Sequence, residues 1–147
     1  MRYVTRKLAD VLSRAARHFP ATVVTGPRRA GKTTLLRKLF RGAQYVLLED
    51  PDIQGRIRSD PRALLEELHS PVIFDEIQNA PELLNYVRTI IDERPRRMGQ
   101  WLFTGSQEAP LMRGITESMA GRAAILQLLP FSRFGDGESK FAVRWLS

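Results

Sequence analysis

The segment that most constrains the fold is a glycine-bounded loop followed by lysine and threonine. It matches the pattern G-x-x-x-x-G-K-[ST], in which glycine lets backbone N–H groups close around a phosphate. The residues expected to contact a nucleotide are Gly26, Pro27, Arg28, Arg29, Ala30, Gly31, Lys32, Thr33 and Thr34. Within this loop we expect Lys32 to reach the β- and γ-phosphates and the Thr33 hydroxyl to bind Mg²⁺.

The residues on either side supply the strand and the helix that such a loop requires. Residues 21–25 are apolar and partly β-branched, and they follow a proline. Residues 33–40 place their apolar side chains on one helical face. A glycine turn in another kind of α/β protein is the alternative, and this context favours the phosphate loop.

Strand-like and helix-like stretches alternate along the chain. The strand-like runs are 21–25, 44–48, 71–76, 100–104 and 123–129, the last ending at Pro130, and the helical stretches are 7–19, 33–41, 60–70, 79–91 and 110–120. Residues 52–59 fit a short helix or an exposed loop equally well. The alternation predicts an α/β three-layer sandwich, in which helices cover both faces of a five-stranded, mainly parallel sheet. We expect one core domain over residues 1–132 and an unpatterned tail over 133–147.

Composition excludes several kinds of site. The chain has no cysteine, which rules out disulfides, thiolate metal sites and cysteine nucleophiles. Its two histidines, His18 and His69, are far apart in sequence, so that a zinc site is not expected. The chain also lacks a signal-peptide core and any apolar run of the roughly 18 residues that span a bilayer. We therefore expect a cytoplasmic protein without a membrane segment.

Positive charge is concentrated in the first part of the chain. The net charge is +7, and residues 1–41 contain many lysines and arginines but only one acid, Asp10. This distribution fits the attraction of ATP or of a nucleic-acid backbone. It fits equally the solvated faces of two amphipathic helices, so that charge alone does not establish nucleic-acid binding.

Two acids follow the third apolar run, at the point where the strand should end. We expect Asp75 to hold Mg²⁺ and Glu76 to polarise the water that attacks the γ-phosphate. A pair of solvated loop carboxylates is the alternative. Their position after a phosphate loop favours the functional interpretation.

Further polar residues follow the fourth strand-like run. Thr104, Ser106 and Gln107 lie where open α/β sheets place their ligands, and Ser106 is our preferred candidate for contact with the γ-phosphate or the attacking water. Ordinary turn polarity around Gly105 explains any single one of them equally well. Arg122 is a candidate arginine finger, in cis or from a neighbouring subunit, and equally a surface arginine.

Four segments in order carry a family resemblance: GPRRAGKTT, VIFDEIQ, LFTGSQ and SMAGRAAILQLLPFS. Together they resemble the AAA-type ATPases of bacteria and archaea that carry an N-terminal ATPase core and a C-terminal domain of unknown function. The resemblance covers about residues 3–132 and implies an AAA-like P-loop NTPase fold of the ASCE type. It also implies a Walker A motif over 26–33, a Walker B motif at Asp75 and Glu76, a sensor region over 104–107 and a characteristic arginine at Arg122. Such proteins continue well past the PFS segment, so this chain resembles an ATPase core without the C-terminal domain.

The leading functional hypothesis is an ATPase core that binds ATP and hydrolyses it with Mg²⁺. The chain has no Asn-Lys-x-Asp guanine-reading motif, which favours adenine. A second hypothesis is a nucleotide-binding switch or nucleic-acid-interacting module with little hydrolysis of its own, and an oligomer is compatible with either. A small-molecule kinase ranks third, because neither an early acceptor-binding acid nor a mobile lid is evident.

Overall fold

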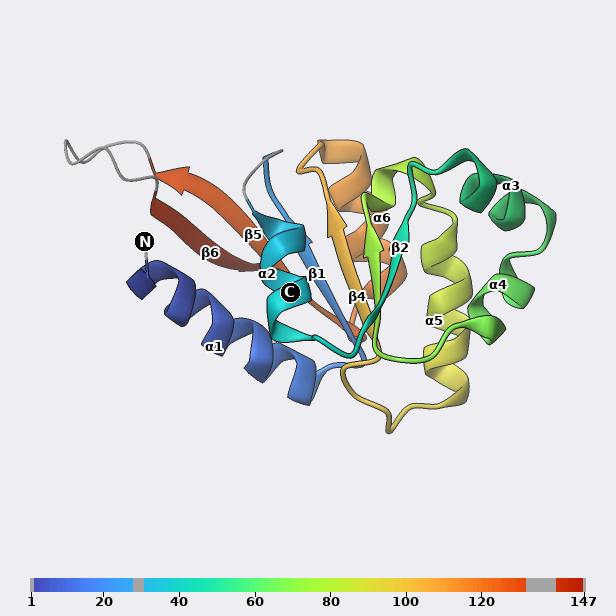
Figure 1. The fold of residues 1–147 in the computed structure, drawn as a ribbon, viewed down its shortest axis with the longest axis horizontal. Coiled ribbons are helices and arrows are strands. Elements are labelled where there is room, and N and C mark those ends of the chain that lie inside the picture. Colours follow the sequence, from blue (N-terminus) through green and yellow to red (C-terminus); the bar gives the residue numbers. More distant parts are fainter. Residues whose placement is uncertain (1, 28–30, 132–139, 147) are drawn as a thin grey trace.

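A computed structural model describes the backbone of residues 2–27, 31–131 and 140–146, and the side chains of residues 7–27 and 31–128. The expected alternation of strands and helices is confirmed (Figure 1). In chain order the elements are α1 (Arg2–His18), β1 (Ala21–Thr25), α2 (Lys32–Leu39), β2 (Gln44–Leu47), α3 (Pro51–Ser59), α4 (Pro61–Glu67), β3 (Val72–Asp75), the 3₁₀ helix η1 (Ile77–Asn79), α5 (Leu83–Glu93), β4 (Trp101–Gly105), α6 (Ala109–Met119), β5 (Ala123–Phe131) and β6 (Lys140–Leu146).

The strands form one sheet in the order β2-β3-β4-β1-β5-β6. The first five in this order run parallel, which confirms the predicted parallel sheet, and β6 pairs antiparallel with β5. Parallel strands must be joined by crossovers, and the helices between them supply these. All five parallel strands therefore direct their carboxyl ends toward the same edge of the sheet.

Each central strand contributes apolar side chains to both faces of the sheet. Within β1, Val23 packs into one buried cluster and Val24 into the other, as the period of two requires. The cluster that contains Val24 is covered by α1 and α2, through Leu12 and Leu36 among others. Side chains from α3 to α6 cover the opposite cluster. The predicted three-layer sandwich is confirmed.

The strand β2 differs from the buried strand that its apolar run predicts. It pairs only with β3, so that it forms an edge of the sheet. Val46 is buried, whereas Gln44 is exposed and Tyr45 keeps 36% of its surface exposed. The ambiguous stretch after this strand is α3, whose start is capped by the Asp50 carboxylate accepting from the Asp52 N–H.

The tail expected to lack a pattern contains the strand β6. Its residues pair with β5 from Ile125 to Phe131, and Pro130 lies inside β5 rather than ending it. Among the described residues, β1 pairs with β5 only as far as Gln127, so that Pro130 has a ladder partner on one side, Phe141 of β6. Proline is tolerated at such an edge position because no ladder hydrogen bond is lost. No helix in the described part of the chain is long and apolar enough to cross a membrane.

Candidate functional site

Three neighbouring parallel strands end side by side at one edge of the sheet, and the candidate site lies there. β4 lies between β3 and β1, with Phe103 opposite Phe74 and Gly105 opposite Thr25. Immediately after β1, the Gly26 N–H donates to the Gly105 carbonyl over 3.2 Å. This hydrogen bond joins the start of the phosphate-loop segment to the end of β4.

The two glycines of the loop meet different structural requirements. A Cβ atom on Gly26 would lie 3.0 Å from the Cβ of Leu128 and 3.1 Å from its carbonyl oxygen, so that a larger residue would push β5 away. Gly31 has a φ of 82°, in the left-handed region that glycine adopts without strain. Residues 28–30, three of the predicted binding residues, lie outside the part of the chain that the structure describes.

Lys32, the first residue of α2, is buried although it carries a charge, with 5% of its surface exposed. Its Nζ atom donates to the carbonyl oxygens of Gly26 at 2.6 Å, Gly105 at 3.1 Å and Pro27 at 3.4 Å. An ammonium group that leaves water requires such partners. These carbonyl groups hold the lysine head between the ends of β1 and β4.

The Asp75 carboxylate, at the end of β3, accepts hydrogen bonds from hydroxyl groups on three other elements. The Thr33 hydroxyl on α2 donates to Oδ1 over 2.7 Å, and the buried Thr104 hydroxyl on β4 donates to the same oxygen over 2.5 Å. The Tyr45 hydroxyl on β2 donates to Oδ2. The predicted metal-binding pair, Thr33 and Asp75, is therefore in direct contact, whereas Thr34 is exposed.

Sequence reasoning assigned no role to Tyr45. Partial burial, followed by the hydrogen bond to Asp75, raises the pKa of the Tyr45 hydroxyl well above its ordinary value. The ring also lies under the Arg37 guanidinium, with 4.6 Å between the guanidinium carbon and the ring centroid. The sequence signal was slight: a polar-tipped aromatic residue alternating with buried Val46 on a strand.

Glu76 has an unusual backbone conformation directly after β3. Its φ of 67° is the only positive value among the non-glycine residues that the structure describes. Such conformations cost about 1–3 kcal/mol and cluster at functional sites. Its N–H donates to the Thr104 hydroxyl over 2.9 Å, and its carboxylate accepts from the Gln78 side chain. The Thr104 hydroxyl thus accepts from the Glu76 N–H and donates its own proton to the Asp75 carboxylate.

The three polar candidates after β4 differ in their hydrogen bonding. The Thr104 hydroxyl is committed to the two acids. Gln107 is exposed and accepts from Gln127 at 3.5 Å. The Ser106 hydroxyl is buried and has no hydrogen-bond partner among the described residues. A buried hydroxyl without a partner is costly, and a ligand at this edge would relieve the cost.

Arg122 lies at the opposite edge of the sheet from these residues. It immediately precedes β5, and its carbonyl accepts from the N–H of Ala21 at the start of β1. Its guanidinium forms two hydrogen bonds with the Asp92 carboxylate, of 2.7 and 3.0 Å. Within one chain, β1 separates Arg122 from the phosphate loop, so that the geometry of a single chain does not support a role in cis.

Known proteins resemble the chain in sequence and in fold. It is 34% identical over 143 residues to uncharacterised proteins of Mycobacterium tuberculosis (Rv2008c) and Mycobacterium bovis (Mb2031c), covering 96% of this chain and 32% of each relative. The chain therefore spans about a third of the length of these relatives. In fold it resembles the flagellar accessory protein FlaH from Methanocaldococcus jannaschii, with a TM-score of 0.58 and 14% identity over 93% of this chain and 83% of that one.

A family model gives the assignment directly. The model described as the AAA domain matches residues 18–134, which include every strand from β1 to β5 and all of the site residues described above. This match agrees with the resemblance carried by the four sequence segments. The chain belongs to the AAA domain family.

Proposed function

We propose that this chain is an ATPase core, which binds ATP and hydrolyses it with Mg²⁺. The observation that carries the proposal is the contact between the phosphate-loop helix and the acid of β3. The Thr33 hydroxyl lies 2.7 Å from the Asp75 carboxylate, and the neighbouring Lys32 points its ammonium back into the loop. A lysine, a hydroxyl and a carboxylate at a loop that opens a helix are the groups that phosphoryl-transfer sites use.

The donor set fits magnesium better than a softer metal. Mg²⁺ prefers oxygen ligands and retains several waters, so that one hydroxyl and one carboxylate suffice. Thr33 and Asp75 would hold the ion, which when bound neutralises charge between the β- and γ-phosphates. The described residues contain no group of three or more His, Cys, Asp or Glu side chains that could form a larger metal site. The ion would therefore depend on the nucleotide for its remaining ligands.

Each remaining site residue has a separate task under this proposal. Lys32 would exchange the backbone carbonyls for phosphate oxygens, which are stronger partners because they carry charge. Glu76 would orient and polarise the attacking water as a general base. Ser106 would donate its unpartnered hydroxyl to the γ-phosphate or to that water.

Thermal unfolding with and without Mg·ATP tests the proposal. Ligand at 100 times its Kd stabilises a protein by about 2.7 kcal/mol, which corresponds to a rise of several degrees in Tm. We expect this rise in the wild type and none in Lys32→Ala. Lys38→Ala removes an exposed lysine from the same helix and should retain the full rise. An equal rise in wild type and Lys32→Ala would contradict the assigned site.

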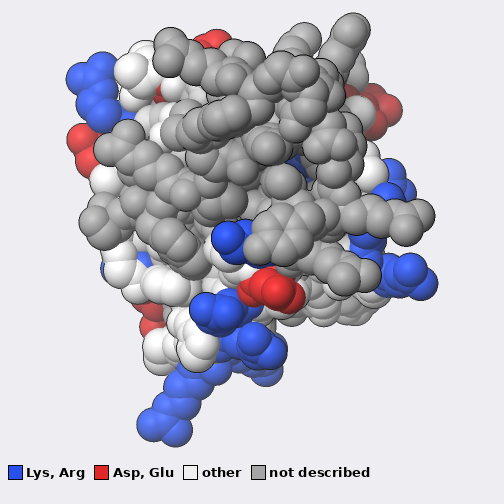
Figure 2. Space-filling view, turned by 90° about the vertical axis from the view of Figure 1, so that its left-hand side faces the viewer, with Lys and Arg blue, Asp and Glu red and all other residues white. Residues whose placement is uncertain are grey.

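A second candidate function is a nucleotide-dependent switch that contacts nucleic acid through α1 and α2. These helices cover the same face of the sheet and expose Arg14, Arg17, Arg37 and Lys38. Figure 2 shows one side of the molecule, on which Lys and Arg side chains gather toward the lower end. Stabilisation by Mg·ATP without steady-state hydrolysis would favour this candidate. Salt-dependent binding of a DNA duplex would support the nucleic-acid contact.

A further inference from the structure

We propose that Gln78 is a positioning residue that holds the Glu76 carboxylate in place for turnover. The inference rests on the proposed ATPase function and adds a residue to it. Gln78 lies in η1, two residues after Glu76, and its carboxamide links the end of β3 to the end of β4. Neither the phosphate loop nor the two acids predict this link.

Both polar atoms of the Gln78 carboxamide form hydrogen bonds. Its Nε2 donates to the Oε2 atom of Glu76. Its Oε1 accepts from the backbone N–H of Ser106 over 3.2 Å. The bridge therefore joins the proposed general base to Ser106, whose buried hydroxyl has no partner among the residues that the structure describes. A donor directed at a carboxylate forms a charge-assisted bond, which is stronger than a bond between neutral groups.

The backbone around Glu76 is fixed by separate hydrogen bonds. Thr104 accepts from the Glu76 N–H at 2.9 Å, while the Glu76 carbonyl accepts from the Asn79 N–H at 3.0 Å and from its Nδ2 at 3.2 Å. These bonds hold the left-handed backbone and do not act on the carboxylate of Glu76. The bond from Gln78 supplies the missing restraint, because it acts on the carboxylate itself.

The close packing of η1 against β4 brings the Gln78 carboxamide within hydrogen-bonding distance of the Ser106 N–H. A Cβ atom on Gly105 would lie 2.8 Å from Cγ2 of the buried Ile77 and 3.5 Å from Oε1 of Gln78. Any residue other than glycine at the end of β4 would therefore push η1 outward. Glycine here brings the carboxamide within reach of Ser106.

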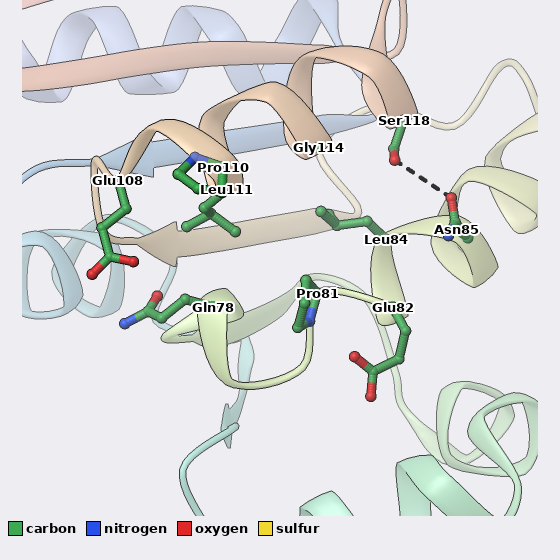
Figure 3. A pocket seen from close by; sticks show the side chains of 10 residues that line it. All are labelled: Gln78, Pro81, Glu82, Leu84, Asn85, Glu108, Pro110, Leu111, Gly114 and Ser118. Carbon is green, nitrogen blue, oxygen red and sulfur yellow. Dashed lines mark hydrogen bonds between the residues drawn. The ribbon is translucent and has the colours of Figure 1, made fainter.

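Packing alone does not hold Gln78 in this position. The residue lines a cavity of about 440 Å³ between η1, the start of α5 and α6. Figure 3 shows its side chain near Glu108 at one end of this cavity, while Asn85 and Ser118 lie at the other. Because one side of Gln78 borders open space, we take its two hydrogen bonds to be the main restraints on the orientation of its carboxamide. Removing them should free Glu76 without collapsing the core.

Loss of this restraint should lower the rate of the chemical step more than it weakens nucleotide binding. Misplacement of a catalytic group by about 1 Å can cost roughly 100-fold in rate. For Gln78→Ala we expect kcat to fall by about 10- to 100-fold, with KM and the Mg·ATP-induced rise in Tm close to those of the wild type. This division between kcat and KM distinguishes a positioning residue from one that only supports the fold.

Gln78→Glu sharpens the test because it has nearly the same shape. The new carboxylate can still accept from the Ser106 N–H, but it cannot donate to Glu76 and it repels it. We expect a loss of kcat at least as large as in Gln78→Ala. Asn85→Ala is the matched control. It removes a carboxamide that lines the same cavity, and that carboxamide accepts a hydrogen bond from Ser118 and makes none to Glu76 among the described residues. Unchanged kcat in both Gln78 variants, or an equal loss in Asn85→Ala, would overturn the inference.

A second measurement separates failure of the bridge from failure of the ATPase proposal. In nucleotide-free, ¹⁵N-labelled protein, the side-chain NH₂ signals of Gln78 should shift in Glu76→Ala, while those of Asn85 stay in place. Unshifted Gln78 signals overturn the bridge whether or not the protein hydrolyses ATP. A wild type that lacks turnover but shows the shift would instead refute the proposed hydrolysis and leave the Gln78–Glu76 contact established.

Discussion

Charged residues at the carboxyl ends of the parallel strands (the carboxyl edge) are buried, whereas those at the amino ends (the amino edge) lie near the surface. At the carboxyl edge, Lys32 and Asp75 are buried, and each is surrounded by hydrogen-bond partners from several elements. At the amino edge, Arg122 and Asp92 form a bidentate pair that is partly open to solvent. Buried charges must be compensated by the fold, whereas surface pairs contribute little to stability. The carboxyl edge therefore includes the desolvation cost of buried charges, which points to a functional role for these residues.

The difference shows which arginines and acids are candidates for chemistry. The sequence favoured a catalytic role for Glu76, whereas it fitted Arg122 equally well as an arginine finger and as a surface arginine. In three dimensions Glu76 lies with the phosphate loop, and Arg122 lies at the far end of the strands. A role for Arg122 in catalysis would therefore require a neighbouring chain.

The largest expected effect is on turnover at the carboxyl edge. Glu76→Gln keeps the shape of the side chain but removes its ability to accept a proton from water. We expect hydrolysis to fall by about 10²- to 10⁴-fold, while the Mg·ATP-induced rise in Tm remains. Steady-state phosphate release and thermal unfolding measure the two effects. Equal hydrolysis by the variant and the wild type would refute the role given to Glu76.

A smaller effect, on stability, is expected at Thr104. Thr104→Val keeps the shape of the residue and removes the hydroxyl that serves both the Asp75 carboxylate and the Glu76 N–H. Unsatisfied buried partners should lower the free energy of unfolding by about 1–3 kcal/mol, measured by urea denaturation. Thr89→Val, which removes an exposed hydroxyl from α5, should change it by less than about 0.5 kcal/mol. A similar loss of unfolding free energy in the two variants would contradict the expectation that the buried Thr104 hydroxyl contributes more to stability than the exposed Thr89 hydroxyl.

The smallest effect is expected at the amino edge. Hydrogen bonds from Arg122 lower the pKa of Asp92, so that the pair stabilises the fold above the usual carboxyl pKa of about 3.9 and loses this contribution as the pH falls through the lowered value. Arg122→Ala should therefore lower Tm slightly at neutral pH and not in strong acid. A loss of hydrolysis in this variant that depends on protein concentration, with nucleotide binding intact, would indicate that Arg122 acts on a neighbouring chain.

The sequence predicts the central part of the fold well because β1, β3 and β4 are buried on both faces. The bounds of β1 and the end of β3 at Asp75 follow from short apolar runs that stop at glycine or at acids. The strand β6 was missed, although Phe141, Val143 and Trp145 alternate with other residues as a strand requires. Its partner β5 is close in sequence, but Pro130 argued against a strand that continues far enough along β5 to pair with β6.

The site was less predictable than the fold because its remaining contacts depend on register. That Thr33 would meet Asp75 follows from the motifs and the shared sheet edge. That Tyr45 and Gln78 would reach the two acids depends on how β2 and η1 sit beside β3 and β4. No local pattern determines such placements, because each is set by packing between elements far apart in sequence, as the contact of Gly105 with Ile77 illustrates.

The position of Lys32 has a consequence for how quickly the loop can accept a nucleotide. Its Nζ atom already donates to the carbonyls of Gly26, Pro27 and Gly105, so that an arriving anion finds the ammonium group engaged with backbone oxygens. An anion that binds the Lys32 ammonium must replace some of these contacts. The charge of Lys32 is thereby compensated before any ligand binds, and the loss of these contacts offsets part of the free energy of a new bond to an anion.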